Sequence, residues 1–214
     1  NNIIECIKKF KINKFYFASS SSVYGDIGPF PKKETSQLHP LNIYSLSKLA
    51  NEQIAKTYSK KIKTSIIGLR FFSIYGEWGR PDMLILKYLI ASKKRKPFEL
   101  FNYGNHYRDF TYIKDVVKIL EKLIFKKEKN KFQILNVCSS RPIFLKKFFN
   151  ISEKFSKKLN IVNVPAHPAD VFKTHGSNKR LINLIKKFKF TNTEIAIKNT
   201  INSYKKYKIY NQKN

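Results

Sequence analysis

The segment that decides the fold is Lys14-Phe-Tyr-Phe-Ala-Ser-Ser-Ser-Ser-Val-Tyr-Gly25. Its start, Phe15–Ser19, is a short apolar run, which predicts a buried strand. Before this run, Ile3, Ile4 and Ile7 recur at helical spacing, and the glycine at its far end marks a loop. We therefore expect a helix that leads into a strand, and a run of serine hydroxyls at the end of that strand.

Strand and helix patterns alternate along the rest of the chain. The expected helices lie at residues 41–58, 83–90, 113–125 and in two parts of 177–210, and the expected strands at 64–69, 98–101 and 132–137. In the helix at 41–58, the apolar Leu46, Leu49 and Ile54 fall on one side. Such alternation predicts an α/β fold in which helices cover both faces of a mostly parallel sheet. Ligands of such sheets bind at the carboxyl ends of strands, which points to the serines after Ala18 and to the stretch after Arg70.

Length and charge narrow the class of protein. The 214-residue length suits one α/β domain with a small lobe, and the 42% hydrophobic content indicates a globular chain. The formal net charge of +29 is typical of nucleic-acid-binding proteins, but most of the 43 basic residues are lysines spread along the whole chain. Because nucleic-acid readers favour the bidentate guanidinium of arginine, we expect these lysines on solvated faces and no nucleic-acid partner. The charge still suits an anionic small-molecule substrate.

Cysteine content and apolar runs bear on the compartment. Cys6 and Cys138 form neither a disulfide framework nor a metal-ligand cluster, so we expect no metal site. No uninterrupted apolar run is long enough to cross a bilayer, and Asn1–Ile4 has no signal-peptide pattern. These features favour a cytoplasmic protein without membrane contacts.

Tyr44 and Lys48 stand four residues apart on the expected helix, so both side chains face the same side. A free tyrosine titrates near pH ~10, too high for a base at neutral pH, and a nearby ammonium lowers such a pKa. A tyrosine in this setting can take the proton of a sugar hydroxyl while hydride leaves the same carbon. The spacing alone is weak support, since Tyr204 and Lys208 repeat it by chance. The order of a serine run, Val-Tyr-Gly, Tyr44 with Lys48, and a strand ending at Arg70 makes the pair a candidate reaction centre.

Four motifs carry a resemblance to a known family. They are Ala18-Ser-Ser-Ser-Ser-Val-Tyr-Gly25, Tyr44-x-x-x-Lys48, Arg70-Phe-Phe-Ser-Ile-Tyr-Gly-Glu-Trp-Gly-Arg-Pro-Asp-Met83 and Asn102-Tyr-Gly-x-x-x-Arg-Asp-Phe-Thr-Tyr-Ile113. With them the chain resembles the NAD-dependent epimerase/dehydratase family, the extended type of short-chain dehydrogenase/reductase. The Trp78–Met83 block resembles UDP-glucuronate 4-epimerases in particular.

The resemblance implies a Rossmann-like doubly wound parallel sheet, incomplete at its N-terminal side, with a small C-terminal substrate-binding lobe. Residues 1–75 would form the C-terminal part of the NAD-binding domain. Residues 76–214 would form mainly the lobe that binds the nucleotide sugar, with returns to the Rossmann domain near 110–140. The implied activity is the interconversion of UDP-glucuronate and UDP-galacturonate through a 4-keto intermediate with bound NAD, for surface polysaccharide synthesis. A full-length protein of this kind would be a homodimer.

The site residues of the family carry over by motif. The catalytic residues would be Ser20, Tyr44 and Lys48, and the cofactor contacts Tyr44, Lys48 and Phe71. The substrate contacts would be Ser21, Ser22, Ser73, Arg80, Arg108 and Asp170, with Leu100 and Phe101 lining a uridine pocket. Arg80 suits a uronate carboxylate by charge and fork geometry, and Arg108 matches the diphosphate-binding arginine. The structural alternatives are a surface loop for Arg80 and an ion pair with Asp109 for Arg108.

Departures from the family pattern leave alternatives open. The 214 residues hold no Gly-x-x-Gly-x-x-Gly phosphate loop, so we expect the N-terminal NAD-binding segment to be missing. Asp170 follows an alanine where the family has glycine, so its role is open. The alternatives are another UDP-sugar epimerase, a dehydratase, a decarboxylase, or an inactive truncated remnant that binds only the nucleotide sugar. Dehydratases and decarboxylases tend to carry acidic residues where Ser21 and Ser22 stand, which favours epimerisation.

Overall fold

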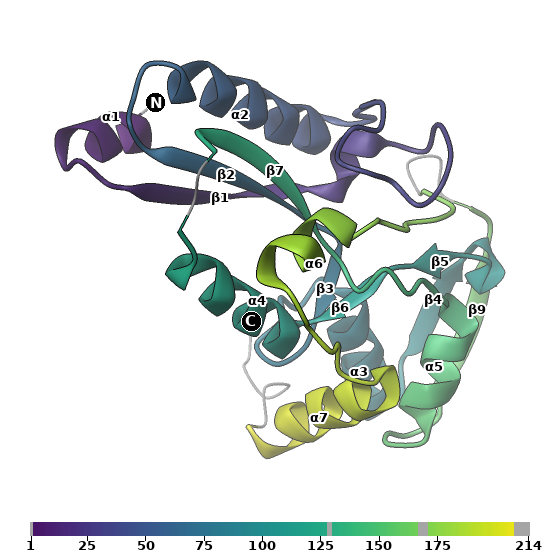
Figure 1. The fold of residues 1–214 in the computed structure, drawn as a ribbon. Coiled ribbons are helices and arrows are strands. Elements are labelled where there is room, and N and C mark those ends of the chain that lie inside the picture. Colours follow the sequence, from purple (N-terminus) through teal and green to yellow (C-terminus); the bar gives the residue numbers. More distant parts are fainter. Residues whose placement is uncertain (1, 128–129, 167–170, 208–214) are drawn as a thin grey trace.

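Within residues 2–127, 130–166 and 171–207, which the computed structural model describes, the main sheet has three parallel strands in the order β1-β2-β7 (Figure 1). These strands are β1 (Lys14–Ser20), β2 (Ser65–Phe71) and β7 (Phe132–Val137). They confirm the strands expected at 15–19, 64–69 and 132–137. Their parallel register confirms the α/β class.

Helices cover both faces of this sheet (Figure 1). They are α2 (Ile43–Ser59) on one face, and α4 (Ile113–Phe125) with α6 (Lys179–Ile185) on the other, while α1 (Asn2–Lys9) leads into β1. Because side chains of a strand alternate between the two faces, Ile67 and Leu69 of β2 pack with α4 and α6, whereas Arg70 faces α2. The doubly wound arrangement is therefore confirmed in the described strands.

The side of α2 that faces the sheet is more polar than expected. Its buried residues are Ser45, Glu52, Ala55 and Ser59. Leu46 and Ile54, expected with Leu49 on one side of the helix, are 56% and 40% exposed, so these two residues do not pack on the sheet. The cause is that Glu52 faces inward to pair with Arg70, a contact that apolar periodicity does not reveal.

The second part of the fold is built from short strand pairs. β3 (Ser73–Tyr75) pairs in parallel with β6 (Phe110–Tyr112), β4 (Pro97–Phe101) in parallel with β9 (Asn160–Val164), and β5 (Tyr107–Arg108) antiparallel with β8 (Ile143–Phe144). The helices α3 (Leu84–Lys94), α5 (Leu145–Glu153) and α7 (Thr193–Lys206) pack with them around a core rich in aromatic rings. Strands of two or three residues are too short for periodicity to reveal, and the sequence analysis missed them together with β9 and α5.

The buried apolar residues form two large clusters. One lies between the sheet and the helices α4 and α6, and the other fills the space among α3, α5 and α7. A division at residue 75 stays a prediction. In the described ranges, none of the helices combines the length and apolar character that crossing a membrane requires.

Candidate active site

The candidate reaction centre lies where α2 crosses the carboxyl end of β1. The Lys48 ammonium donates a hydrogen bond to the carbonyl oxygen of Ala18 at 3.0 Å, two residues before Ser20. The same nitrogen lies 5.6 Å from the centre of the Tyr44 ring, close enough for a cation–π contact. Tyr44 is 57% exposed, so its hydroxyl is open to a ligand. The structure therefore brings Tyr44 and Lys48 to the strand end that Ser20 occupies.

The start of α2 is fixed next to Tyr44. The Asn42 side chain accepts a hydrogen bond from the Ser45 backbone N–H at 2.9 Å, and the Ser45 hydroxyl accepts one from the Asn42 N–H at 3.1 Å. This reciprocal capping box satisfies two backbone donors at the helix start. Because Tyr44 lies between the two capping residues, its backbone position is set by them.

The serine run folds into a tight turn at the end of β1. Ser20 caps the short 3₁₀ helix η1 (Ser21–Tyr24), and its Oγ accepts hydrogen bonds from the backbone N–H of Ser22 at 3.2 Å and from the Ser22 hydroxyl at 2.9 Å. Gly25 ends the turn with a φ of +60°, and a Cβ there would lie 2.2 Å from the carbonyl oxygen of His39. Only glycine fits this position, so the serine hydroxyls are held at the strand end.

Phe71, predicted to contact the cofactor, lies beside Ser20. It is the last residue of β2, and the parallel register pairs it with Ser20 of β1 and Val137 of β7. Its ring is half-buried and packs against the cluster beneath the sheet. The carboxyl ends of the three described strands therefore meet around Ser20 and Phe71.

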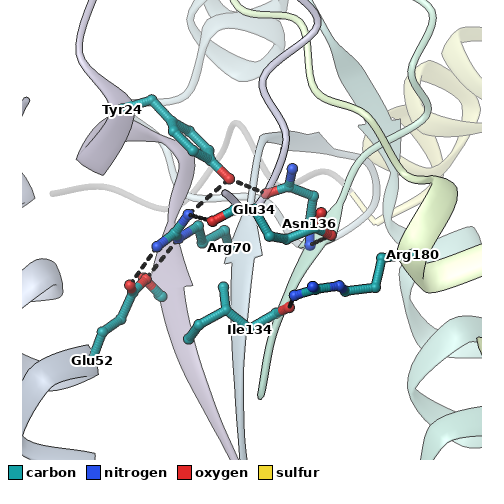
Figure 2. Close-up of polar contacts among 8 residues, drawn as sticks. Tyr24, Glu34, Glu52, Arg70, Ile134, Asn136 and Arg180 are labelled. Carbon is teal, nitrogen blue, oxygen red and sulfur yellow. Dashed lines mark hydrogen bonds and ion pairs between the residues drawn. The ribbon is translucent and has the colours of Figure 1, made fainter. Parts of the chain in front are cut away.

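A buried ion pair, which we call the Glu52–Arg70 clamp, fastens α2 to the sheet (Figure 2). The Arg70 guanidinium donates two hydrogen bonds to the Glu52 carboxylate, at 2.9 and 2.6 Å, and the two side chains are only 3% and 4% exposed. The Ser19 hydroxyl donates to the same carboxylate. Glu52 follows Lys48 by one helical turn and Ser19 precedes Ser20, so the clamp ties the helix of the candidate base to the strand of the candidate serine.

Glu52 is not among the residues predicted from the sequence. The signal that could have found it is Arg70 itself, which lies at the end of an otherwise apolar strand. A buried guanidinium requires a charged partner. Glu52 stands four residues after Lys48 on α2, the helix that packs on β2.

The polar network continues from the clamp across the sheet to β7 (Figure 2). The third guanidinium nitrogen of Arg70 donates to the Tyr24 hydroxyl at 2.9 Å, and that hydroxyl donates to the Asn136 side-chain oxygen at 2.7 Å. Asn136 in turn donates from its backbone N–H to the Glu34 carboxylate at 3.0 Å. Burial raises the pKa of Tyr24 to about 12, so its hydroxyl stays protonated and keeps its donor role.

A second feature is an apolar cavity of about 230 Å³ between β3, β4 and the start of α3, which we call the nucleotide cavity. Ser73, Leu100, Phe101 and Arg108, all predicted to contact substrate, line it together with the buried His106. The structure thus brings these four predicted residues together. Apolar walls with a cation at one side suit a planar base joined to an anionic group.

Arg108 is oriented by the backbone around it. Its guanidinium donates to the carbonyl oxygens of Tyr107 and Phe172, both at 3.1 Å. The neighbouring Asp109 is fully buried, and its two oxygens accept hydrogen bonds from the Ser139 hydroxyl at 2.8 Å and the Gly176 N–H at 3.0 Å. Burial raises the pKa of Asp109. The guanidinium is therefore presented to the cavity, while Asp109 holds the segments around it in place.

Three described residues predicted to contact substrate, Ser21, Ser22 and Arg80, do not line the nucleotide cavity. Arg80 lies in the loop between β3 and α3 and forms a bidentate ion pair with Asp82, at 3.1 and 2.8 Å, with both side chains mostly exposed. Its fork is therefore occupied by a carboxylate of the chain itself. Asp170 lies outside the described residues.

Residues 1–138 match the model of the NAD dependent epimerase/dehydratase family. The chain belongs to this family. The match confirms the resemblance drawn from the serine run, the Tyr44–Lys48 spacing and the motifs that follow. It also includes the Glu52–Arg70 clamp, which lies within the matched residues.

Several relatives within the epimerase/dehydratase family are named as 4-epimerases. A probable UDP-glucuronate 4-epimerase of Rhizobium meliloti is 30% identical over 195 residues, which are 82% of this chain and 57% of that protein. UDP-glucuronate 4-epimerase 5 of Arabidopsis thaliana is 38% identical over 180 residues, 75% of this chain and 41% of that protein. The chain spans roughly half to two thirds of the length of the first curated relatives that it matches.

A solved structure shows the same fold. The UDP-glucuronic acid 4-epimerase of Bacillus cereus, crystallised with UDP-glucuronic acid and NAD, superposes with a TM-score of 0.88 at 25% identity. The superposition covers 96% of this chain and 65% of that one. It confirms the Rossmann-like arrangement expected for an epimerase/dehydratase chain.

Proposed function

We propose that the protein is an NAD-dependent UDP-sugar 4-epimerase that interconverts UDP-glucuronate and UDP-galacturonate. The observation that carries the proposal is the meeting of Tyr44, Lys48 and Ser20 at the end of β1, with the Lys48 ammonium fixed on the carbonyl oxygen of Ala18. An exposed phenol beside a fixed ammonium can transfer a proton to and from a sugar hydroxyl.

Each of these residues has a defined task in the reaction. Tyr44 takes the proton of the C4 hydroxyl and later returns it, and Ser20 donates a hydrogen bond to the same oxygen. The Lys48 ammonium stands beside the Tyr44 ring and is kept at the strand end by its hydrogen bond to the Ala18 carbonyl oxygen. The keto sugar must turn over within the site before the proton returns. Because the hydroxyls of Ser20 and Ser22 are hydrogen-bonded to each other, they form one polar wall along which it turns.

The residues present fit the nicotinamide end of NAD. The exposed Tyr44 and the half-buried Lys48 stand beside the carboxyl end of β1, and Phe71 ends the neighbouring strand. When bound, the cofactor accepts hydride from C4 of the sugar and returns it. The sequence of 214 residues holds no glycine-rich phosphate loop, so we assign only the nicotinamide ribose and ring to these three side chains.

The substrate would span two sites. The uridine would lie in the nucleotide cavity against Leu100 and Phe101, and the diphosphate beside Arg108. The sugar would then reach the hydroxyls of Ser21 and Ser22 in the serine turn and of Ser73 in the wall of the nucleotide cavity. Arg80 would bind the uronate carboxylate after leaving Asp82, and Asp170 is kept as a further substrate contact.

The test is to incubate the full-length protein that contains this chain with UDP-glucuronate and NAD, and to separate the UDP-hexuronates by chromatography. We expect UDP-galacturonate to form, and the reverse reaction to reach the same ratio. Formation of UDP-pentose from UDP-glucuronate, or of a 4-keto-6-deoxy sugar when UDP-glucose is supplied in its place, would contradict the proposal and indicate a decarboxylase or a dehydratase. Ser21 and Ser22 argue against these two reactions, because neither side chain can serve as the extra acid or base that elimination requires.

A second candidate is a remnant that binds nucleotide sugar without NAD. The observation that favours it is the complete nucleotide cavity in a chain without a phosphate loop. Equilibrium dialysis of the 214-residue chain against NAD and against UDP-glucuronate separates the two. Binding of both ligands supports the epimerase, and binding of the sugar nucleotide alone supports the remnant.

We also propose a cytoplasmic homodimer that forms through α2. Its outward face exposes Ile43, Leu46 and Ile54, which are 86%, 56% and 40% exposed. A contiguous apolar helix face of this kind is typical of a subunit contact. Light scattering of the full-length protein should give twice the monomer mass, and Leu46→Lys should halve it.

A further inference from the structure

An exposed aromatic pair lies on the second part of the molecule, away from the nucleotide cavity. Trp78, the only tryptophan of the chain, is 71% exposed, and Tyr207 beside it is 51% exposed. Their ring centres are 5.1 Å apart at an angle of 38°. Large aromatic rings left open to water on a folded surface often mark a binding site.

The pair borders a cavity of about 620 Å³, which we call the α7 cavity. Its other wall is formed by Asn199, Asn202 and Ser203 of α7, whose spacing places them on one helix face. In the described part of the chain, the amides of Asn199 and Asn202 have no hydrogen-bond partner. The lining of this cavity therefore combines aromatic rings with free donors and acceptors.

Two lysines set the charge of the α7 cavity. Lys206 extends from the same face of α7, and Lys114 stands at the start of α4 beside Glu77. Glu77 accepts hydrogen bonds from the Tyr112 hydroxyl at 2.7 Å and from Lys114 at 2.9 Å, so its charge is compensated within the wall. The remaining charge of Lys206 disfavours a cationic ligand and favours a neutral or acidic one.

The exposed pair is not required to hold the loop that carries Trp78. That loop is already fastened to α7 by the Tyr204 hydroxyl, which donates to the carbonyl oxygen of Gly76 at 2.9 Å and accepts from the Gly79 N–H at 3.2 Å. Tyr204 is fully buried, so this attachment is protected from water. Trp78 and Tyr207 therefore provide an exposed aromatic surface and are not needed to fasten the loop to α7.

We propose that the α7 cavity binds a pyranose ring of a carbohydrate, with preference for an acidic sugar. The aromatic pair would contact the apolar C–H face of the ring. Asn199, Asn202 and Ser203 would bond its hydroxyls, and Lys206 would attract a carboxylate. No residue is shared between the linings of this cavity and the nucleotide cavity, so the site is separate and does not rest on the proposed epimerase activity.

The single tryptophan makes the site directly testable. The fluorescence of Trp78 in the full chain is recorded during titration with methyl glucuronide, methyl glucoside and UMP. We expect a saturable change with both glycosides, tighter for the glucuronide, with a dissociation constant near or above about 1 mM as suits so small a ligand. UMP should leave the glycoside titration unchanged, because it occupies the other cavity. The Arg108→Ala variant should bind both glycosides as tightly as the parent does, which shows that the two sites are separate.

Calorimetric titration of variants completes the test. Asn202→Ala should weaken the glycosides about fivefold, Lys206→Gln should weaken only the glucuronide, and Trp78→Ala should abolish binding. Phe125→Ala, which removes an 83% exposed ring from α4, is the matched control and should bind normally. No saturable change with either glycoside would overturn the proposal. So would a Trp78→Ala protein that melts at a lower temperature but binds sugar unchanged, since the pair would then be structural only.

Discussion

The reaction centre and the nucleotide cavity are built on opposite principles. Around Tyr44, the buried contacts are charged or hydroxylic, and the reactive side chain is on the surface. Around Arg108, the cavity walls are mostly apolar rings and branched chains, although the polar His106 and Asp109 are buried beside them. The first region depends on a few directional bonds, and the second on packing spread over many residues. Single substitutions should therefore have large effects in the first region. In the second region their effects should be smaller, because the contacts are shared among many residues.

The Glu52–Arg70 clamp explains why the first region is polar. An apolar contact would tolerate sliding of α2 along β1, whereas a bidentate ion pair has one register. Such a pair adds little net stability compared with a well-packed apolar contact, because both charges lose their water. The contribution of the pair here is to fix the position of α2 on the sheet, since the pair lies one helical turn from Lys48 and one residue from Ser20.

The largest effect is expected for Tyr44→Phe in the full-length protein. Loss of the phenolic oxygen removes the proposed base, so kcat for UDP-hexuronate interconversion should fall by about 10²–10⁴. Tyr44 is 57% exposed, so the free energy of unfolding should not change. Steady-state rates and urea unfolding measure the two quantities. Tyr103→Phe, at a similarly exposed ring, is the control, and a Tyr44→Phe enzyme with nearly full activity would remove Tyr44 from the mechanism.

The second largest effect is expected for the Glu52–Arg70 clamp. It distinguishes the role of the clamp in positioning α2 from its contribution to the stability of the fold. Glu52→Ala leaves the Arg70 charge buried without its partner, which should lower the free energy of unfolding by about 3–5 kcal/mol. The double variant Glu52→Leu, Arg70→Met should recover most of this loss, because no unpaired charge remains. Urea unfolding of the 214-residue chain gives both values.

The exposed Glu121→Ala serves as control for the clamp and should change stability by less than about 0.5 kcal/mol. If the double variant is as stable as the parent but epimerises slowly, the clamp acts by positioning Lys48 and Ser20. An unchanged rate in that variant would show that packing alone sets the register of α2.

Alkaline pH probes the Tyr24 link between the clamp and β7. Burial raises the pKa of Tyr24 to about 12 from the value near 10 that it has in the unfolded chain. The neutral form is thus favoured by folding, so its contribution is fully present below pH ~10 and is lost as the pH rises through about 12. Two pKa units correspond to about 2.7 kcal/mol. Urea midpoints of the parent should fall across this window, and Tyr24→Phe, compared with Tyr103→Phe, should show a shallower fall.

The two regions were also unequally predictable from the sequence. Ser20, Tyr44, Lys48 and the strands around them lie close together in the chain and carry local patterns, so their elements were placed within a few residues. The clamp was not found, because a buried Glu on an amphipathic helix breaks the rule that apolar residues face the core. For the same reason Leu46 and Ile54 are exposed, although apolar residues recur along their side of the helix.

The nucleotide cavity depends on contacts that no local pattern encodes. β5 and β8 are two residues long, and they pair Arg108 with Ile143 across a long stretch of chain. Phe172, whose carbonyl orients the Arg108 guanidinium, is farther still in sequence. The motif around Arg108 predicts this residue as a substrate contact, whereas its hydrogen-bond partners are seen only in the tertiary structure.

A moderate effect is expected for Arg108→Ala. The loss of a charged hydrogen-bond donor at the rim of the nucleotide cavity should weaken UDP binding about 10–100-fold. The guanidinium also donates to two backbone carbonyl oxygens at 3.1 Å, and the loss of these bonds should lower the free energy of unfolding by about 1–3 kcal/mol. Calorimetry with UDP measures the affinity, and Lys118→Ala controls for the loss of one positive charge. Equal losses in both variants would mean that general charge, not Arg108, attracts the diphosphate.

The smallest effect is expected for Asp82→Asn, and it decides what Arg80 does. The Arg80–Asp82 pair has side chains 74% and 59% exposed, so its removal should change the free energy of unfolding by less than about 1 kcal/mol. If Arg80 binds the uronate carboxylate, it must leave Asp82 to do so, and weakening this competitor should tighten UDP-glucuronate binding a few-fold. UDP-glucose, which lacks the carboxylate, should bind Asp82→Asn and the parent equally. A gain for both sugars would assign the effect to the removed negative charge, and no gain for either would leave Arg80 as a surface cation of its own loop.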